Sequence, residues 1–349
     1  MRGKLKRFVV MRKDGNSRPR KISPTGSANP QYQRMKALVT GGAGFIGSHL
    51  AEALCRRGAR VVALDNLSLG SRDNLNWRRG NDELEFVEGD LRDEKLLAKI
   101  VPGCDRVFHQ GALPSVPRSV AQPLESNGHN LDGTLKVLLA ARDAKVKRFI
   151  FASSSSIYGD VDAPLKHEEL PPNPLSPYAL QKYAAEKYAQ LFHSLYGLET
   201  VCLRYFNIFG PRQASNSPYS GVIAKFCTAM LRGEAPVIFG DGQQSRDFTF
   251  VANAVAATLL AAEAPAERAA GKVFNIAAGQ SISLLQLVAE LNQLTKQKLQ
   301  PRFEPPRAGD VHSSQADISA AVAALGYAVK VPWAEGLART LDFYRQGAI

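Results

Sequence analysis

The strongest candidates for chemistry in this chain are Tyr178 and Lys182, four positions apart in the segment N-P-L-S-P-Y-A-L-Q-K-Y (173–183). The segment predicts the start of a helix, on which residues four apart share one face. A lysine ammonium beside a phenol stabilises the phenolate and lowers the pKa of the tyrosine. The pair therefore predicts a tyrosine that acts as a general base near neutral pH.

The same spacing occurs again at Tyr183 and Lys187, so the pattern alone is not specific. Placement distinguishes the two pairs, because Tyr178 follows Pro177 at the predicted helix start whereas Tyr183 lies in mid-helix on a different face. The alternative for either pair is a solvated helix surface with no catalytic role.

Four consecutive hydroxyls, Ser153 to Ser156, follow the apolar run F-I-F-A (149–152). Such a run is typical of a buried strand, and the active sites of α/β proteins lie at the carboxyl ends of strands. A serine hydroxyl at this point could hold the substrate oxygen that Tyr178 deprotonates.

A dinucleotide site is indicated by the segment K-A-L-V-T-G-G-A-G-F-I-G (36–47), in which Gly41, Gly44 and Gly47 follow an apolar run and precede a helical pattern. Such glycines allow close approach of the backbone to a pyrophosphate, and a helix N-terminus offers it free N–H groups. The next apolar run, R-V-V-A-L-D (60–65), ends in Asp65, where an acid suits the ribose 2′-hydroxyl and repels a 2′-phosphate. We therefore expect NAD, the alternative being an ordinary strand-end aspartate.

These residues require a scaffold of alternating strands and helices. Short apolar runs bounded by turn residues predict strands, and the segments between them have helical periodicity. The predicted strands are 36–40, 60–64, 84–88, 106–109, 147–152 and 200–204, and the predicted helices are 45–57, 93–101, 128–144 and 177–196. The alternation predicts an α/β fold with a Rossmann-type, doubly wound parallel sheet.

The character of the sequence changes after Asn207, where a long polar loop (210–221) begins. Further helices are predicted near 219–232, 252–264, 283–297 and 334–346, with a strand at 272–277. We expect a NAD-binding domain at 35–206 and, at 207–349, mainly a smaller substrate-binding lobe with excursions back to the sheet.

The net charge of +12 is concentrated in the first 34 residues, where ten Lys/Arg and one Asp account for +9 of it. The remaining +3 argues against a nucleic-acid partner for the folded body. Residues 1–34 are too polar and proline-broken to build a core, and they are expected to be a disordered extension. A targeting segment, or translated upstream sequence with Met35 as the natural start, are the alternatives.

Cysteine and histidine usage points to an ordinary intracellular protein. The four cysteines and six histidines show no metal-ligand spacing, so no metal is expected, and the cysteines fit reduced, cytoplasmic thiols. No apolar run approaches membrane-spanning length, so no membrane partner is expected.

The chain from Met35 onward resembles the extended short-chain dehydrogenases/reductases, and among them the nucleotide-sugar 4-epimerases. The motifs that carry the resemblance are T-G-G-A-G-F-I-G-S-H-L, G-D-L-R-D, S-S-S-S-I-Y-G, S-P-Y-A-L-Q-K, L-R-Y-F-N-I-F-G-P-R-Q, G-D-G-Q-Q-S-R-D-F-T-F-V and P-P-R-A-G-D-V. The family usually forms homodimers through two helices per subunit, for which 128–144 and 177–196 are the expected pair.

The resemblance implies roles for individual residues. It assigns the catalytic group to Tyr178, Lys182 and Ser154. It assigns NAD contacts to Gly41, Gly44, Phe45, Ile46, Gly47, Asp65, Asn66, Asp90, Leu91, Gln110, Gly111 and Ala112, and also to Tyr178 and Lys182. It assigns contacts with the UDP-sugar to Ser154, Ser155, Asn207, Arg246, Arg307, Asp310 and Ser314.

Two departures from other family members favour one reaction and indicate which sugars are accepted. Family members that dehydrate or decarboxylate carry acids just after the catalytic hydroxyl, where this chain has Ser155 and Ser156. The small Ser314 resembles the residue that admits an N-acetyl group in UDP-N-acetylglucosamine 4-epimerases. We therefore expect C4 epimerisation of UDP-N-acetylglucosamine and of UDP-glucose. The alternatives are a UDP-glucuronate 4-epimerase, with Arg118 as the cation for the carboxylate, and a non-catalytic NAD-binding regulator.

Overall fold

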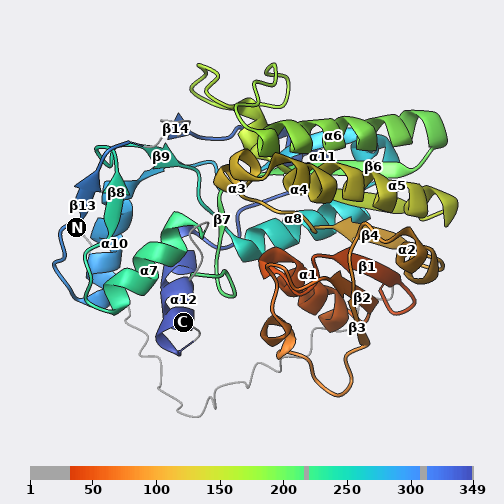
Figure 1. The fold of residues 1–349 in the computed structure, drawn as a ribbon, viewed down its shortest axis with the longest axis horizontal. Helices are drawn as coiled ribbons and strands as arrows, with labels where there is room; N and C mark the ends of the chain where they lie inside the picture. Colours follow the sequence, from red (N-terminus) through yellow and green to blue (C-terminus); the bar gives the residue numbers. More distant parts are fainter. Residues whose placement is uncertain (1–31, 216–219, 307–312, 348–349) are drawn as a thin grey trace, which may run out of the picture.

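A seven-stranded parallel sheet forms the centre of the molecule, as the computed structural model of residues 32–215, 220–306 and 313–347 shows (Figure 1). Its strand order is β11-β6-β5-β4-β1-β2-β3. The strands are β1 (Lys36–Thr40), β2 (Arg60–Asp65), β3 (Leu84–Glu88), β4 (Arg106–His109), β5 (Arg148–Ser154), β6 (Glu199–Tyr205) and β11 (Lys272–Ile276). The predicted Rossmann-type fold is confirmed.

The order of the strands fixes where a ligand can bind. β1 pairs with β2 on one side and with β4 on the other. Strands β2 and β3 are therefore added on one side of β1 and the later strands on the other side, so the strand order reverses beside β1. In open parallel sheets, the crevice at the carboxyl ends of the strands next to such a reversal binds the ligand. The glycine segment at the end of β1 opens at this point.

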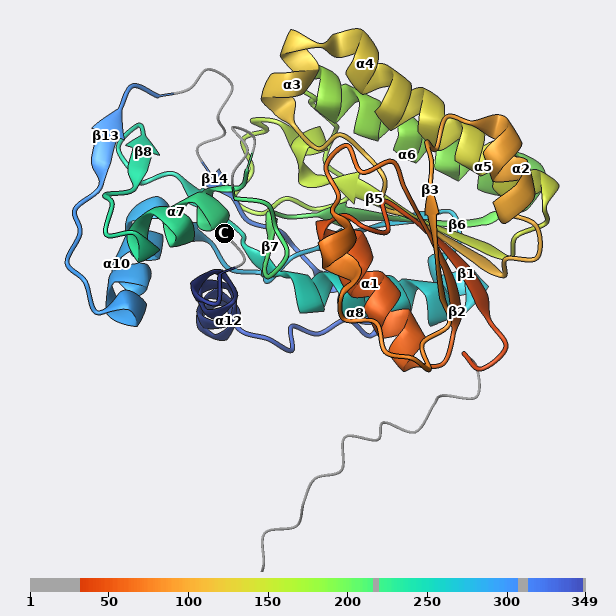
Figure 2. The ribbon, with the colours of Figure 1, turned by 60° about the horizontal axis from the view of Figure 1, so that its bottom comes forward.

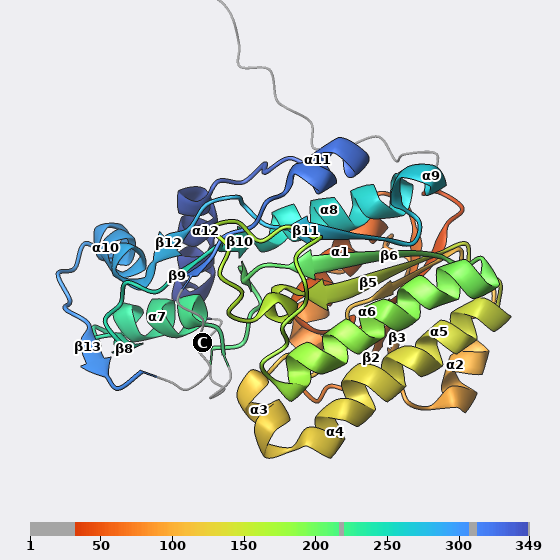
Figure 3. The same ribbon diagram turned by 90° about the horizontal axis from the view of Figure 1, so that it is seen from above.

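Helices cover both faces of the sheet (Figure 2). On one face, α1 (Phe45–Arg56) packs beside α8 (Val251–Glu263). On the other face lie α2 (Glu94–Ile100), α5 (Gly133–Asp143) and α6 (Pro177–Tyr196), of which α6 contacts both β5 and β6. Figure 3 shows α5 and α6 side by side on this face. Separate clusters of buried apolar side chains fill the two interfaces, so each helical layer has its own core.

Local sequence explains where α6 begins and ends. Ser176 caps its N-terminus by accepting a hydrogen bond from the Ala179 N–H at 3.2 Å, and Pro177 occupies the first turn, where its missing N–H is not needed. Gly197 ends the helix in a left-handed conformation. These signals hold Tyr178 in the first turn of the helix, next to the end of β5.

The segment predicted as one helix at 128–144 is divided. A π-helical turn spans Gly128–Asp132, and α5 follows it. Two short helices that the sequence did not predict, α3 (Val116–Ala121) and α4 (Pro123–Asn127), precede it. Two 3₁₀ turns, η1 (Arg72–Leu75) and η3 (Ser155–Tyr158), follow β2 and β5 respectively.

The second half of the chain builds a smaller lobe from short elements, at the left of Figure 1. Its helices α7 (Val222–Leu231), α10 (Leu284–Thr295) and α12 (Trp333–Arg345) surround paired strands of two or three residues. The strands are β7 (Ile208–Phe209), β8 (Val237–Phe239), β9 (Ser245–Arg246), β10 (Thr249–Phe250), β12 (Ile282–Ser283), β13 (Arg302–Glu304) and β14 (Ser313–Ser314). Between them the chain returns to the sheet through α8, α9 (Ala266–Ala269) and β11, and later through α11 (Ser319–Leu325).

Residues 1–31 lie outside the described part of the chain. The prediction of a disordered basic extension therefore concerns residues that the structure does not describe. Tyr32, three residues before Met35, is fully buried. Its hydroxyl donates to Glu263 and accepts from Arg57 at 3.1 Å. Of the helices that the structure describes, none combines the length and the apolar composition needed to cross a bilayer.

Candidate active site

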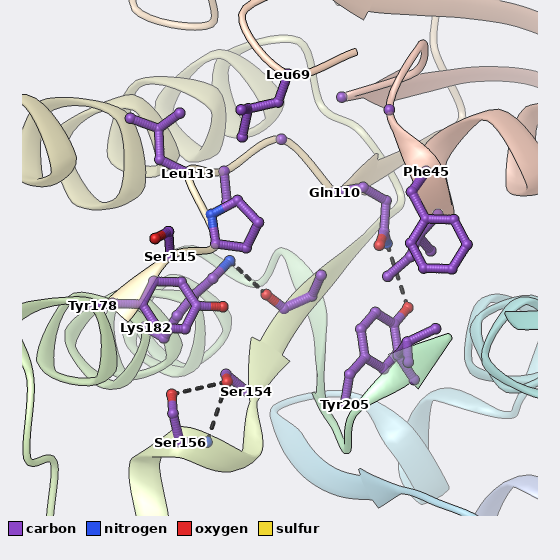
Figure 4. A pocket seen from close by; sticks show the side chains of 18 of the residues that line it. Phe45, Leu69, Gln110, Leu113, Ser115, Ser154, Ser156, Tyr178, Lys182 and Tyr205 are labelled. Carbon is purple, nitrogen blue, oxygen red and sulfur yellow. Dashed lines mark hydrogen bonds between the residues drawn. The ribbon is translucent and has the colours of Figure 1, made fainter. Parts of the chain in front are cut away.

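A cavity of about 720 Å³ lies at the carboxyl ends of the central strands, between the sheet and the smaller lobe. It brings together most of the residues predicted for the site (Figure 4). The predicted residues that line it are Gly41, Gly44, Phe45, Ile46, Gly47, Asp65, Asn66, Leu91, Gln110, Gly111, Ala112, Ser154, Ser155, Tyr178, Lys182, Asn207, Arg246 and Ser314.

The glycine loop is so closely packed that side chains could not replace its hydrogens. A Cβ on Gly47 would lie 2.0 Å from the carbonyl oxygen of Gly41. Gly41 itself has φ +65°, a conformation that favours glycine. Helix α1 begins after Gly44 with no side-chain cap, so the loop presents backbone N–H groups to the cavity. This cradle fits the pyrophosphate of a dinucleotide.

Asp65, at the end of β2, is buried and fastened to the loop. Its carboxylate accepts hydrogen bonds from the Ala43 N–H at 3.0 Å and the Leu67 N–H at 2.8 Å. Burial raises the pKa of Asp65, and these backbone donors oppose the rise. A carboxylate has room for about four donors, so acceptor capacity remains for a ribose hydroxyl.

Asn66 and Leu91 also line the cavity, whereas Asp90 lies behind them. The Asp90 carboxylate accepts from Asn66 at 3.0 Å and forms an ion pair with Arg92 at 2.7 Å. The hydrogen bonds from Arg92 hold the pKa of Asp90 well below its usual range. Asp90 is therefore bonded to a residue of the cavity wall, and its own side chain is not part of that wall.

Gln110 directly follows β4 and lines the cavity with part of its amide unused. Its Nε2 reaches the Tyr205 hydroxyl at 3.5 Å, but its Oε1 is buried and has no partner among the described residues. Buried acceptors are normally satisfied, so this oxygen points to a bound ligand. The unused acceptor and the glycine cradle both fit a dinucleotide in this half of the cavity.

Ser154, Tyr178 and Lys182 come together on the opposite wall. Tyr178 and Ser154 lie close enough for the serine to affect the pKa of the phenol, and the Ser154 Oγ lies 2.8 Å from that of Ser156. The Lys182 ammonium donates to the carbonyl oxygen of Ala152 at 2.8 Å (Figure 4). The second pair stands apart: the Lys187 ammonium lies over the Tyr183 ring, and neither residue lines the cavity.

The electrostatics differ from the simplest expectation. Burial raises the pKa of Tyr178, and the interaction that lowers it comes from Ser154 and not, as the spacing suggested, from Lys182. Burial also lowers the pKa of Lys182 to about 7, because a charged ammonium is costly in a desolvated site. Lys182 is therefore close to its titration midpoint at neutral pH.

The lobe residues meet at the other end of the cavity. β14 pairs with β9, which places Ser314 opposite Arg246. Asn207, with φ +38°, donates from its side chain to the Asp247 carbonyl at 3.2 Å and to the Ser314 hydroxyl at 3.4 Å. Arg307 and Asp310, also predicted here, lie outside the described residues.

The cavity wall also contains residues that the sequence analysis did not assign. Tyr205 and Arg212 belong to the quoted motif L-R-Y-F-N-I-F-G-P-R-Q, which could have identified them. Val116 and Val120 come from α3, which the sequence did not predict. Arg118, the candidate for a sugar carboxylate, lines the cavity but forms an ion pair with Glu125 at 2.9 Å.

Comparison with known proteins agrees with this geometry. Residues 37–277 match the model of the NAD dependent epimerase/dehydratase family. The UDP-glucose 4-epimerase of Mycolicibacterium smegmatis is 39% identical over 315 residues, covering 89% of this chain and 99% of that protein. The chain therefore belongs to the NAD dependent epimerase/dehydratase family.

Solved structures show the same likeness. A UDP-N-acetylglucosamine 4-epimerase from Methanobrevibacter ruminantium M1, in complex with UDP-N-acetylmuramic acid, is 41% identical with a TM-score of 0.85, covering 90% of this chain and 99% of that one. The Thermotoga maritima UDP-glucose 4-epimerase, with UDP-glucose, is 39% identical with a TM-score of 0.84, covering 89% and 99%. The predictions of an NAD-dependent nucleotide-sugar 4-epimerase and of NAD as its cofactor are confirmed.

Proposed function

We propose that this enzyme interconverts UDP-N-acetylglucosamine and UDP-N-acetylgalactosamine, and also UDP-glucose and UDP-galactose. The observation that carries the proposal is the wall on which Tyr178 and Ser154 meet beside Lys182, with only serines following Ser154. A carboxylate at those positions would favour elimination or decarboxylation, and none is present. The relatives act on both kinds of sugar by their names, so the choice of sugar is the part that needs testing.

Tyr178 is the base in this proposal. It takes the proton of the sugar 4-hydroxyl, while Ser154 orients the same oxygen through its hydroxyl. When bound, NAD supplies the acceptor and later the donor of the hydride at C4. The product of the first half-reaction is a 4-keto sugar. Its ring rotates to present the opposite face while its diphosphate stays bound. Tyr178 then returns the proton to the oxygen at C4.

The lobe residues hold the nucleotide end of the substrate in this scheme. Arg246 suits a diphosphate because a guanidinium fork matches phosphate oxygens. Asn207 and Ser314 are joined by a hydrogen bond and line the same end of the cavity. Arg307 and Asp310 are proposed to complete this set. The small side chain of Ser314 leaves room for an N-acetyl group.

UDP-glucuronate is the less favoured substrate. Recognition of its carboxylate requires a cation, and the guanidinium of Arg118 already binds Glu125. A non-catalytic regulator is also disfavoured, because NAD binding alone would not need Tyr178, Lys182 and Ser154 on one wall.

The test is to incubate the purified protein separately with UDP-glucose, UDP-N-acetylglucosamine and UDP-glucuronate, and to resolve the C4 epimers by chromatography. We expect conversion of the first two sugars without added NADH, because each cycle regenerates NAD. Conversion of UDP-glucuronate alone would overturn the assignment of the sugar. Bound NAD without conversion of any of the three would favour the regulator.

We also propose a cytoplasmic homodimer that supplies sugars for polysaccharide synthesis. The cysteines are free and buried, which suits a reducing compartment.

Large apolar side chains are exposed along α6 and α4, among them Leu195 at 67% and Leu124 at 88%. A patch of this kind marks an interface. Light scattering should give twice the mass of the chain, and Leu195→Glu should halve it.

A further inference from the structure

Three side chains on one face of α6 face three consecutive residues of β5. Tyr178 and Ser154 lie on the same wall of the cavity (Figure 4), and the Lys182 ammonium donates to the Ala152 carbonyl. Between these two strand residues, the Ser153 hydroxyl donates to Glu186 Oε2 at 2.7 Å. The helix residues are four and eight positions apart, so they form one row along the helix. The proposed function includes Tyr178 and Lys182 and leaves the contact of Glu186 unexplained.

Glu186 is fully buried, and its charge is matched by the guanidinium of Arg204. Arg204 of β6 donates from Nη2 to Oε1 at 2.7 Å and from Nε to Oε2 at 3.0 Å. The other terminal nitrogen of Arg204 donates to the Tyr158 hydroxyl at 2.8 Å, and Tyr158 lines the cavity. A buried ion pair contributes little net stability, whereas its fixed geometry can specify one arrangement of the elements that carry it.

We propose that Glu186 is a positioning residue for the reaction, acting through Ser153. Held by Arg204, it fixes the rotation and the axial position of α6 against the end of β5. It thereby sets how the phenol of Tyr178 meets Ser154. The inference rests on the proposed roles of Tyr178 and Ser154, and it adds a group that touches neither substrate nor cofactor.

The geometry makes this coupling effective. Eight residues of helix span about 12 Å, and a helix of this length moves as a rigid rod. Tyr178 sits in the first turn of α6, where the backbone has the fewest intrahelical bonds. The Ser176 cap holds this turn together, and the row of contacts sets the position of the turn against β5. Displacement of a reacting group by about 1 Å can lower the rate by about 10²-fold.

The test removes the contact of Glu186 with Ser153 alone. Ser153→Ala deletes the hydroxyl and leaves the pair of Glu186 with Arg204 intact. Thr200→Val is the matched control, because the Thr200 hydroxyl is also buried and also ties the sheet to α6, donating to the Ala189 carbonyl at 2.7 Å. That bond lies further along the helix and involves no residue of the row.

We expect Ser153→Ala to lower kcat about tenfold or more while KM for the UDP-sugar stays within about twofold and NAD remains bound. Thr200→Val should leave kcat unchanged, although both variants lose thermal stability. Equal kcat values in the two variants would overturn the positioning role, and so would a loss confined to KM. The wild-type protein separates this result from the proposed function, because absence of turnover there would refute the function itself. Glu186→Gln is expected to lower kcat further than Ser153→Ala does. If Glu186→Gln does not fold, Ser153→Ala still decides the question.

Discussion

The two ends of the cavity are built in different ways. At the cofactor end, long parallel strands carry the site: β5 pairs with β6 through all seven residues from Arg148 to Ser154. At the lobe end, β14 pairs with β9 through only two residues. The ladder of a long sheet fixes the position of each strand end by itself. Two-residue pairings cannot, so another set of bonds must hold the substrate residues in place.

Asp247 supplies those bonds at the lobe end. Its carboxylate is fully buried and accepts hydrogen bonds from the backbone N–H groups of Ala278 at 2.9 Å, Gly279 at 3.1 Å and Ala316 at 3.2 Å. It thus joins three loops, and it follows Arg246 directly in sequence. Because the two ends are held by different bonds, we expect substitutions at each end to affect different properties. Variants at the cofactor end should change kcat or NAD binding, and variants at the lobe end should change KM.

The largest effect is expected for Tyr178→Phe. Loss of the phenolic proton carrier should lower kcat by about 10²- to 10⁴-fold while NAD stays bound, because general acid–base catalysis contributes about that much. Tyr183→Phe, in the second Tyr-x-x-x-Lys pair, is the control and should retain turnover. Steady-state rates with UDP-N-acetylglucosamine, and NAD content by absorbance after denaturation, check the outcome. Near-normal turnover of Tyr178→Phe would falsify the assigned base.

The next effect is expected in the glycine loop. Gly47→Ala places a methyl group 2.0 Å from the Gly41 carbonyl oxygen, so the loop must move and the cradle for the pyrophosphate is lost. Gly80→Ala is the control, since a Cβ there meets no atom within 4 Å. We expect purified Gly47→Ala to contain little NAD, and Gly80→Ala to contain as much as wild type. Full NAD content in Gly47→Ala would show that the loop does not hold the cofactor.

Asp247→Asn is expected to have a smaller effect, and on KM instead of on kcat or NAD content. The amide turns one acceptor into a donor that faces backbone N–H groups, and each unsatisfied buried donor costs about 1–3 kcal/mol. KM for the UDP-sugar should rise about tenfold or more, with NAD content unchanged. Asp241→Asn is the control, because that carboxylate is exposed and accepts from one backbone N–H, of Gln243 at 2.9 Å. An unchanged KM in Asp247→Asn would remove the distinction between the two ends.

The same contrast explains what the sequence could predict. The strands of the main sheet and helix α6 were foreseen because apolar periodicity, glycines and caps are local signals. The catalytic wall followed from them, since Ser154 and Tyr178 lie at the ends of regular elements. The short helices α3 and α4 were missed because they contain only six and five residues, too few to show a helical period, although each has a proline in its first turn, where proline is favourable.

The bonds that organise the lobe could not be predicted. Asp247 binds backbone N–H groups, which every residue but proline has, and the partners lie up to 69 positions away. The pair of Glu186 with Arg204 spans two elements, with no motif to indicate that their side chains meet. Two-residue strands have no alternation from which to recognise them. Local order was therefore predictable, whereas long-range polar contacts needed coordinates.

The smallest expected effect concerns the cost of keeping the catalytic lysine buried. The pKa of Lys182 falls from its ordinary 10.5 to about 7 in the folded protein. Between these pH values the unfolded chain binds more protons than the folded one, so this group makes stability rise with pH across that window. Below the window both states are protonated, and the full cost of burying the ammonium is present and no longer depends on pH. Lys182→Met has no ammonium at this position, so its free energy of unfolding lacks this dependence on pH. Urea unfolding at pH 7, 8 and 9 should show wild type gaining on Lys182→Met by at most about 1.4 kcal/mol per pH unit. Lys187→Met, which removes an exposed lysine of the same helix, is the reference. Parallel stability curves for wild type and Lys182→Met would mean that the ammonium is not desolvated, and the wall beside Tyr178 would then be wetter than its burial indicates.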